Sequence, residues 1–305
     1  MSWLLTTRAL PGGGPVAPIQ AYANPPDSNG VLMNQLIGAC KGKDVLIATH
    51  GFNVNQEEGI AHLAQWEPLL SLPGEAVYVG LLWPGDSVWL HALIYPEAAK
   101  VAKQAGDELS AWLNKKLAGA TSLSFVSHSL GARVVLETIG GLDSLFQVRR
   151  LLLMAGAIDA NCLGNEYAAA AKRVQKISNL ASRQDDVLKW AFPLGNPISG
   201  LFADGHPFWK AAIGREGPMA SPPAPAQFDK RCMMPPPWGY GHDAYLPPPT
   251  PMPVSAAFAM PVNDPVPMDA EPAAYTPAAY VNAPSGLDAD WKGAWTAGFE
   301  STRLG

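Results

Sequence analysis

The chain has 305 residues, a formal net charge of −5, 48% hydrophobic residues and 15% charged residues. This is enough apolar material to build the core of one large domain or two small ones, and it excludes a globally disordered chain. No cluster of Lys and Arg supplies the basic face that nucleic acid or an anionic membrane surface requires, so neither is expected as a partner.

Export and membrane signals are also missing from the sequence. No uninterrupted apolar run reaches the roughly 18 residues of a membrane span, and the N-terminal residues make a poor signal peptide. The three cysteines, Cys40, Cys162 and Cys232, are widely spaced and odd in number. They indicate a reducing compartment without a disulfide framework, and they lack the paired spacing of a zinc site. We therefore expect a cytoplasmic protein that needs no metal and no organic cofactor; the sequence does not indicate its oligomeric state.

Apolar runs alternate with segments of helical periodicity through the first two thirds of the chain. After candidate edge strands at 3–7 and 19–23, strands are predicted over 44–49, 75–83, 121–127, 148–155 and 174–180, and helices over 55–71, 96–118, 130–140 and 166–172. Nearly continuous apolar strands separated by helices favour a parallel sheet covered on both faces. With right-handed crossovers this predicts an α/β fold, a three-layer α/β/α sandwich with a mostly parallel, doubly wound sheet.

Proline divides the chain into two compositional regions. Of its 30 prolines, 18 lie in residues 218–284, which therefore cannot contain long regular elements. We predict one domain over 1–245, with 190–213 as a candidate cap or lid, followed by a Pro/Ala-rich extension over 246–305. Scattered aromatic residues in that extension favour partial docking on the domain over a wholly disordered tail.

The segment Ser127-His128-Ser129-Leu130-Gly131 lies where a buried strand gives way to a helix. A serine on such a tight turn projects its hydroxyl above the sheet, and small residues two positions before and after it let strand and helix approach closely. The usual pattern has glycine at both flanking positions, and here the first is Ser127. The sequence thus predicts Ser129 as a nucleophile, the alternative being an ordinary helix N-cap serine.

A serine hydroxyl needs a base, and the base needs an orienting carboxylate; in this architecture the acid and then the histidine follow the serine in the chain. Two histidines follow Ser129. His242 lies beyond the last predicted strand, where a loop can return it to the sheet, and is favoured over His206, which lies in an aromatic-rich segment. Asp185, Asp186 and Asp159 all follow predicted strands and stay open as the acid.

Backbone N–H groups are needed to bind the developing oxyanion. One comes from Leu130, directly after the nucleophile at a helix N-terminus. The second is expected from Phe52, in the loop His50-Gly51-Phe52-Asn53 after the strand at 44–49. His50 itself is expected to be structural. The candidate substrate-pocket residues are His50, Asn53, Trp83, His128, Trp190 and Phe192. Aromatic residues near predicted loop ends, Trp83, Trp190 and Phe192 among them, favour an uncharged, apolar substrate.

Together these motifs resemble the alpha/beta-hydrolase superfamily of serine esterases and lipases, and within it a bacterial alpha/beta-hydrolase family of largely unassigned function. The resemblance covers roughly residues 45–245. Beyond the motifs above it rests on Trp83-Pro84-Gly85, Ala155-Gly156-Ala157-Ile158-Asp159-Ala160, Ser182-Arg183-Gln184-Asp185-Asp186-Val187-Leu188, Gly214-Arg215-Glu216-Gly217-Pro218 and Gly241-His242.

The resemblance implies Asp185 as the acid, because the family pattern has a serine, two residues, the aspartate, two residues and a leucine. It also implies His242 as the base, and a serine hydrolase that cleaves small or medium apolar carboxylic esters through an acyl-enzyme. Two alternatives remain: thioesterase, amidase or acyltransferase chemistry with the same triad, and a catalytically silent, hydrolase-like binding protein.

Overall fold

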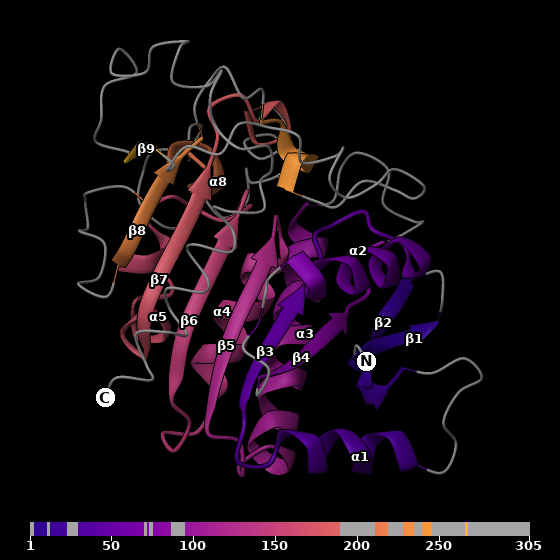
Figure 1. Cartoon of the computed structure of the whole chain (residues 1–305). Coiled ribbons are helices and arrows are strands. Elements are labelled where there is room, and N and C mark those ends of the chain that lie inside the picture. The colour runs from indigo at the N-terminus through magenta and orange to yellow at the C-terminus, as the bar shows by residue number, and fades with distance from the viewer. Residues whose placement is uncertain are drawn as a thin grey trace.

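The apolar runs form one continuous sheet in the computed structural model, which describes residues 3–10, 13–22, 30–69, 72, 76–86, 95–189, 211–218, 228–234, 240–245 and 266–267 (Figure 1). In spatial order the strands of this described part are β2 (Gly13–Ala21), β1 (Trp3–Leu10), β4 (Val77–Leu82), β3 (Asp44–Thr49), β5 (Ser122–His128), β6 (Val148–Met154), β7 (Val174–Ala181), β8 (Phe228–Met233) and β9 (Val266–Pro267). The strands from β1 to β8 in this order run parallel, and β2 and β9 pair antiparallel at the two ends.

Helices cover this sheet. They are α1 (Val31–Cys40), α2 (Gln56–Leu69), α3 (Tyr95–Lys116), α4 (Gly131–Gly141), α5 (Ala168–Lys172) and α8 (Ile213–Glu216), with 3-10 turns η1 (Cys162–Gly164) and η3 (His242–Tyr245). Four of the helices, α2, α3, α4 and α5, lie where the sequence predicts helices. Because parallel crossovers are right-handed, α2, which returns the chain from β3 to β4, lies on the face opposite α3 and α4, which lead on to β5 and β6. The α/β/α sandwich and the doubly wound sheet are thereby confirmed. None of the described helices combines the length and apolarity of a membrane span.

The central strands are buried because their side chains face helices on both sides. All seven residues of β5 are buried, and its neighbours β3 and β6 are almost entirely so. This explains why none of these strands shows the regular alternation of apolar and charged residues that is typical of a strand with one face in solvent. The strand β5 therefore ends at a fixed point in the middle of the sheet, with β3 on one side and β6 on the other.

The sequence prediction missed several elements, among them α1 and β8. The helix α1 follows Gly30, which adopts a left-handed conformation with φ 65°, and it buries Leu36 and Cys40 one turn apart. The strand β8 has the sequence FDKRCM, whose three charged residues hide it within the Pro-rich region. It nevertheless pairs with β7 and extends the parallel sheet, and Val266–Pro267 of the C-terminal extension pairs with it in turn.

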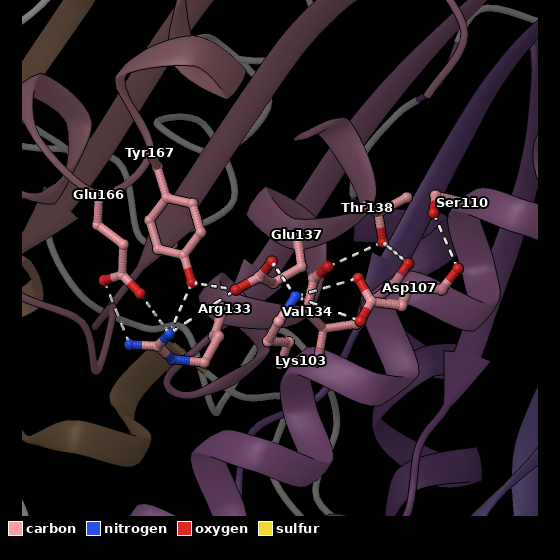
Figure 2. Close-up of polar contacts among 10 residues, drawn as sticks. Lys103, Asp107, Ser110, Arg133, Val134, Glu137, Thr138, Glu166 and Tyr167 are labelled. Carbon is pink, nitrogen blue, oxygen red and sulfur yellow. Dashed lines mark hydrogen bonds and ion pairs between the residues drawn. The ribbon is translucent and has the colours of Figure 1, made fainter. Parts of the chain in front are cut away.

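A polar network holds α4 to its neighbours (Figure 2). Glu137 of α4 accepts hydrogen bonds from Lys103 of α3, at 3.1 Å, and from the hydroxyl of Tyr167, at 2.8 Å. Arg133, one turn earlier in α4, donates to Glu166 at 2.7 Å and to the Tyr167 hydroxyl at 2.8 Å. Exposed pairs of this kind contribute at most about 1 kcal/mol each. Together they fix the orientation of the helix that begins two residues after Ser129.

Candidate active site

Four parallel strands deliver the candidate residues to one edge of the sheet. The strands β3, β5, β6 and β7 are neighbours and end at Thr49, His128, Met154 and Ala181. The loops that follow these strands must converge, because parallel strands all end at the same edge, and this is where ligands bind in such sheets.

Ser129 occupies the turn between β5 and α4 in a conformation that few serines adopt. Its φ is 52°, in the left-handed region. The N–H of Ser129 donates to the carbonyl of Met154 at 2.9 Å, and its own carbonyl accepts the N–H groups of Ala132 and Ala157, both at 3.1 Å. The strained backbone is therefore held from both sides, as expected where strain serves a site.

Two glycines allow the loop after β3 to touch this turn. A Cβ on Gly131 would lie 2.5 Å from the carbonyl oxygen of His50, and a Cβ on Gly51 would lie 2.9 Å from both Nδ1 of His128 and Cβ of Ser129. Real Cβ atoms do not approach other atoms so closely. The glycines of the sequence motifs are thus required by direct contact between the two loops.

Ser129, His242 and Asp185 form a chain of hydrogen bonds although they lie far apart in sequence. Nε2 of His242 lies 2.8 Å from Oγ of Ser129, and Nδ1 of the same ring lies 2.7 Å from Oδ2 of Asp185. Because a carboxylate only accepts, Nδ1 carries the proton and Nε2 is left to accept the serine hydroxyl. The Asp185 side chain is fully buried and that of His242 is 10% exposed. This arrangement can move a proton from Ser129 to His242.

The turn that carries Asp185 is itself fixed. The second carboxylate oxygen, Oδ1, accepts the N–H of Leu188 at 2.8 Å. The guanidinium of Arg215 donates to the backbone carbonyl of Asp185 at 3.2 Å and also to that of Arg183. Arg215 belongs to one of the motifs that carried the resemblance, and its contacts give that motif a structural reason.

The other acids considered from the sequence are placed differently. Asp186 is exposed, and Asp159 pairs with Ala212 in an isolated β-bridge. The carboxylate hydrogen-bonded to His242 is that of Asp185, and neither of the other two appears among the partners of this ring in the described part of the chain. His206 lies outside the described residues, as does all of the candidate cap 190–213 except 211–213.

The candidate oxyanion donors lie on the two loops in contact. Among the described residues, no hydrogen bond uses the N–H of Phe52 or of Leu130, as the role expected for these two amides requires. The next residue, Asn53, has a φ of 58° and donates its N–H to the carbonyl of Gly85 at 2.9 Å. This bond ties the loop after β3 to the loop after β4.

A buried ion pair also holds the loop after β3. Arg8 of β1 is paired with Asp86, and its other terminal nitrogen donates to the carbonyl of Val54 at 2.8 Å. The side chain of Arg8 is 1% exposed. Neither Arg8 nor Asp86 was identified from the sequence, because an arginine in an N-terminal strand carries no motif that links it to a loop some 50 residues away.

His50 and Trp83 are part of this framework. His50 is fully buried and donates Nδ1–H to the carbonyl of Gly51 at 2.9 Å, while its Nε2 accepts the backbone N–H of Trp83 at 3.3 Å. The Trp83 indole donates to the carbonyl of His50 at 2.8 Å, and the two rings stack. Burial lowers the pKa of His50 to about 3, so the ring is neutral near pH 7. This agrees with the structural role expected for His50.

The remaining pocket candidates differ in exposure. Asn53 is exposed, whereas His128 is buried with its Nε2 on the carbonyl of His242, at 2.8 Å. Trp190 and Phe192 lie outside the described residues.

Within the part of the chain that the structure describes, one set of potential metal ligands overlaps the site. Donor atoms of His128, His242 and Asp243 lie within 4.8 Å of one another. Both ring nitrogens of His242 are already hydrogen-bonded, to Ser129 and to Asp185, so a metal ion here would have to displace one of these partners.

Comparison with known protein families agrees with the fold. A family model described as "Alpha/beta hydrolase of unknown function (DUF900)" matches residues 26–201. The chain belongs to this family of alpha/beta hydrolases. The match contains Ser129 and Asp185 and ends before His242. No curated protein matches the chain.

Several solved structures share partial similarity with the chain. Phospholipase PlaB from Legionella pneumophila is 14% identical with a TM-score of 0.28, and the alignment covers 50% of this chain and 41% of that one. A YdeN-like hydrolase from Pectobacterium atrosepticum is 12% identical with a TM-score of 0.24, covering 51% and 70%. A prolyl endopeptidase is 13% identical with a TM-score of 0.32, covering 67% and 31%. The chain thus spans less than half the length of phospholipase PlaB, and at these scores the likenesses do not bear on substrate.

Proposed function

We propose that the protein is a serine hydrolase of carboxylic esters, with Ser129 as nucleophile, His242 as base and Asp185 as the residue that orients the base. The observation that carries this proposal is the unbroken hydrogen-bond chain from Asp185 through His242 to Ser129, at 2.7 and 2.8 Å, which ends on a serine with a φ of 52°. Nucleophile, base and orienting acid in this geometry define a hydroxyl activated for acyl transfer.

The reaction then follows from these contacts. Oγ of Ser129 attacks the acyl carbon while its proton passes to Nε2 of His242, and the carbonyl oxygen becomes an oxyanion. The N–H groups of Phe52 and Leu130 bind that oxyanion. The tetrahedral intermediate collapses, the bond to the alcohol breaks, and His242 delivers its proton to the departing oxygen. A water molecule then attacks the acyl-enzyme, gives its proton to His242, and releases the acid as Ser129 regains its hydrogen.

Asp185 acts throughout by accepting the Nδ1–H of His242. It fixes the tautomer that leaves Nε2 free to accept, and its negative charge stabilises the imidazolium that forms in the transition state. The substrate is a small or medium apolar ester. The aromatic residues of 190–213 support this part of the proposal, and a series of acyl chain lengths tests it.

The test is hydrolysis of p-nitrophenyl esters of increasing acyl length by the wild type and by Ser129→Ala. The wild type is expected to turn over, and the variant to lose at least about 10³-fold in kcat. A matched control is Ser110→Ala, which removes a buried serine hydroxyl that bonds a carbonyl in α3, at 2.8 Å. Ester turnover that survives in Ser129→Ala would overturn the proposal. Turnover of thioesters or amides but not of oxygen esters would keep the triad and correct the substrate class.

A further inference from the structure

The base is carried by a segment that is not part of the sheet. His242 begins η3, and the described segment 240–245 follows β8 in the chain. Two side chains from other elements donate to its backbone carbonyls: Nε2–H of His128 to the carbonyl of His242, at 2.8 Å, and Oγ–H of Ser182 to the carbonyl of Tyr240, at 2.6 Å.

His128 is the last residue of β5 and precedes the proposed nucleophile. It is 2% exposed, and its ring lies 4.9 Å from the ring of His242, at 54°. Because a carbonyl only accepts, Nε2 of His128 carries the ring proton. Burial lowers the pKa of His128 well below 6.5, and the neighbouring His242 lowers it further, so the ring is neutral. His128 therefore supplies a hydrogen-bond donor without adding a positive charge beside the base.

Ser182 directly follows the last residue of β7 and lies three residues before Asp185. It is 1% exposed, its N–H donates to the carbonyl of Gly214 at 2.9 Å, and its Oγ also accepts the N–H of Gln184 at 3.2 Å. The hydroxyl is thus directed at Tyr240 by its own fixed surroundings. The strand that carries the acid and the strand that carries the nucleophile each contribute one donor to the segment that carries the base.

We propose that His128 and Ser182 are positioning residues that dock the segment 240–245, so that His242 reaches Ser129 and Asp185 together. This inference rests on the proposed function. Loss of either donor removes one of the two hydrogen bonds by which these side chains hold the segment, and the ring of His242 can then shift away from Ser129 and Asp185. A small misplacement of a catalytic group lowers the rate of the chemical step much more than it lowers substrate binding.

The experiment measures kcat and KM for a p-nitrophenyl ester in His128→Phe, which keeps a ring but removes the donor, and in Ser182→Ala. Both are expected to lower kcat by about 10- to 100-fold and to leave KM within about 2-fold. His128→Gln, whose side-chain amide restores a donor at similar reach, is expected to recover most of the lost kcat. Ser110→Ala, the matched buried serine remote from the site, is expected to behave as wild type.

Thermal unfolding of each variant shows whether it is folded, and Ser182→Ala carries the test alone if His128→Phe does not fold. Wild-type kcat in the folded donor-less variants, or a rise in KM with kcat unchanged, would overturn the inference. If Ser129→Ala is inactive while these variants are fully active, only the positioning role fails. If Ser129→Ala keeps its turnover, the proposed function itself fails.

Discussion

Replacing Ser129 with glycine should inactivate the protein and yet leave it more stable than the alanine variant. Both substitutions remove the hydroxyl and its 2.8 Å hydrogen bond to His242, so that loss cancels in the comparison. The two variants differ in the backbone: φ at this position is 52°, which glycine adopts freely and alanine does not.

The magnitude follows from two opposing terms. A left-handed conformation costs a residue with a Cβ about 1–2 kcal/mol, and glycine loses about 0.4–1 kcal/mol more conformational entropy on folding than alanine does. The free energy of unfolding of Ser129→Gly is therefore expected to be about 0.5–1 kcal/mol higher than that of Ser129→Ala.

The assay is urea unfolding of both variants, with a matched pair at Ser110 as control. Ser110 lies within α3, where glycine should instead be less stable than alanine by about 0.5–1 kcal/mol. The glycine variant is therefore expected to be more stable than the alanine variant at position 129 and less stable than it at position 110. Equal stability at Ser129, or the same order at both sites, would refute the view that the turn stores backbone strain.

Three further predictions address the acid, the contact between loops and the response to pH. Asp185→Asn should lower kcat for ester hydrolysis by about 10³- to 10⁴-fold, because the amide favours the wrong tautomer of His242. The kcat of Asp186→Asn should stay within about 2-fold of wild type. A larger loss of kcat in Asp186→Asn than in Asp185→Asn would reassign the acid. Gly131→Ala should cost about 1–3 kcal/mol in urea unfolding and lower kcat, since its Cβ would lie 2.5 Å from the carbonyl of His50; unchanged stability and rate would rule out the close contact. Folding should weaken in acid, because the pKa of His50 is about 3 in the folded protein and roughly 6.5 in the unfolded chain, so the unfolded chain binds the extra proton. The contribution of His50 to the free energy of unfolding is complete above about pH 6.5 and falls by about 1.4 kcal/mol per pH unit below it. Urea unfolding at pH 7, 6 and 5 should show that His50→Gln loses this part of the pH dependence.

The sheet was predictable because its central strands are buried on both faces. The runs at 44–49 and 148–155 are mostly apolar, and the run at 121–127 combines Leu123, Phe125 and Val126 with small hydroxyl residues. The strands β3, β5 and β6 lie there to within about one residue. The strand β8 was missed because Asp229, Lys230 and Arg231 lie at its centre and prolines surround it. Periodicity alone does not reveal a polar strand near the edge of a sheet.

The candidate site was predictable only as far as local motifs reach. Small residues at a strand-to-helix junction predict the turn at Ser129. Asp185 and Asp186, in contrast, are adjacent residues of one type. What separates them is the path of the chain, which buries the first against the N–H of Leu188 and exposes the second. The contact of His128 with the carbonyl of His242 joins residues 114 positions apart, and no local signal encodes it.

The most direct test of the account is covalent labelling with a fluorophosphonate, followed by mass mapping of the labelled peptide. A serine reacts rapidly with this probe only when a neighbouring base accepts its proton. The account predicts a single label on Ser129 in the wild type, with labelling strongly slowed in His242→Ala and in Asp185→Asn and unchanged in Ser110→Ala. A folded wild-type protein that takes no label, or a label on a different serine, would contradict the assignment of Ser129 as a nucleophile activated by His242 and Asp185.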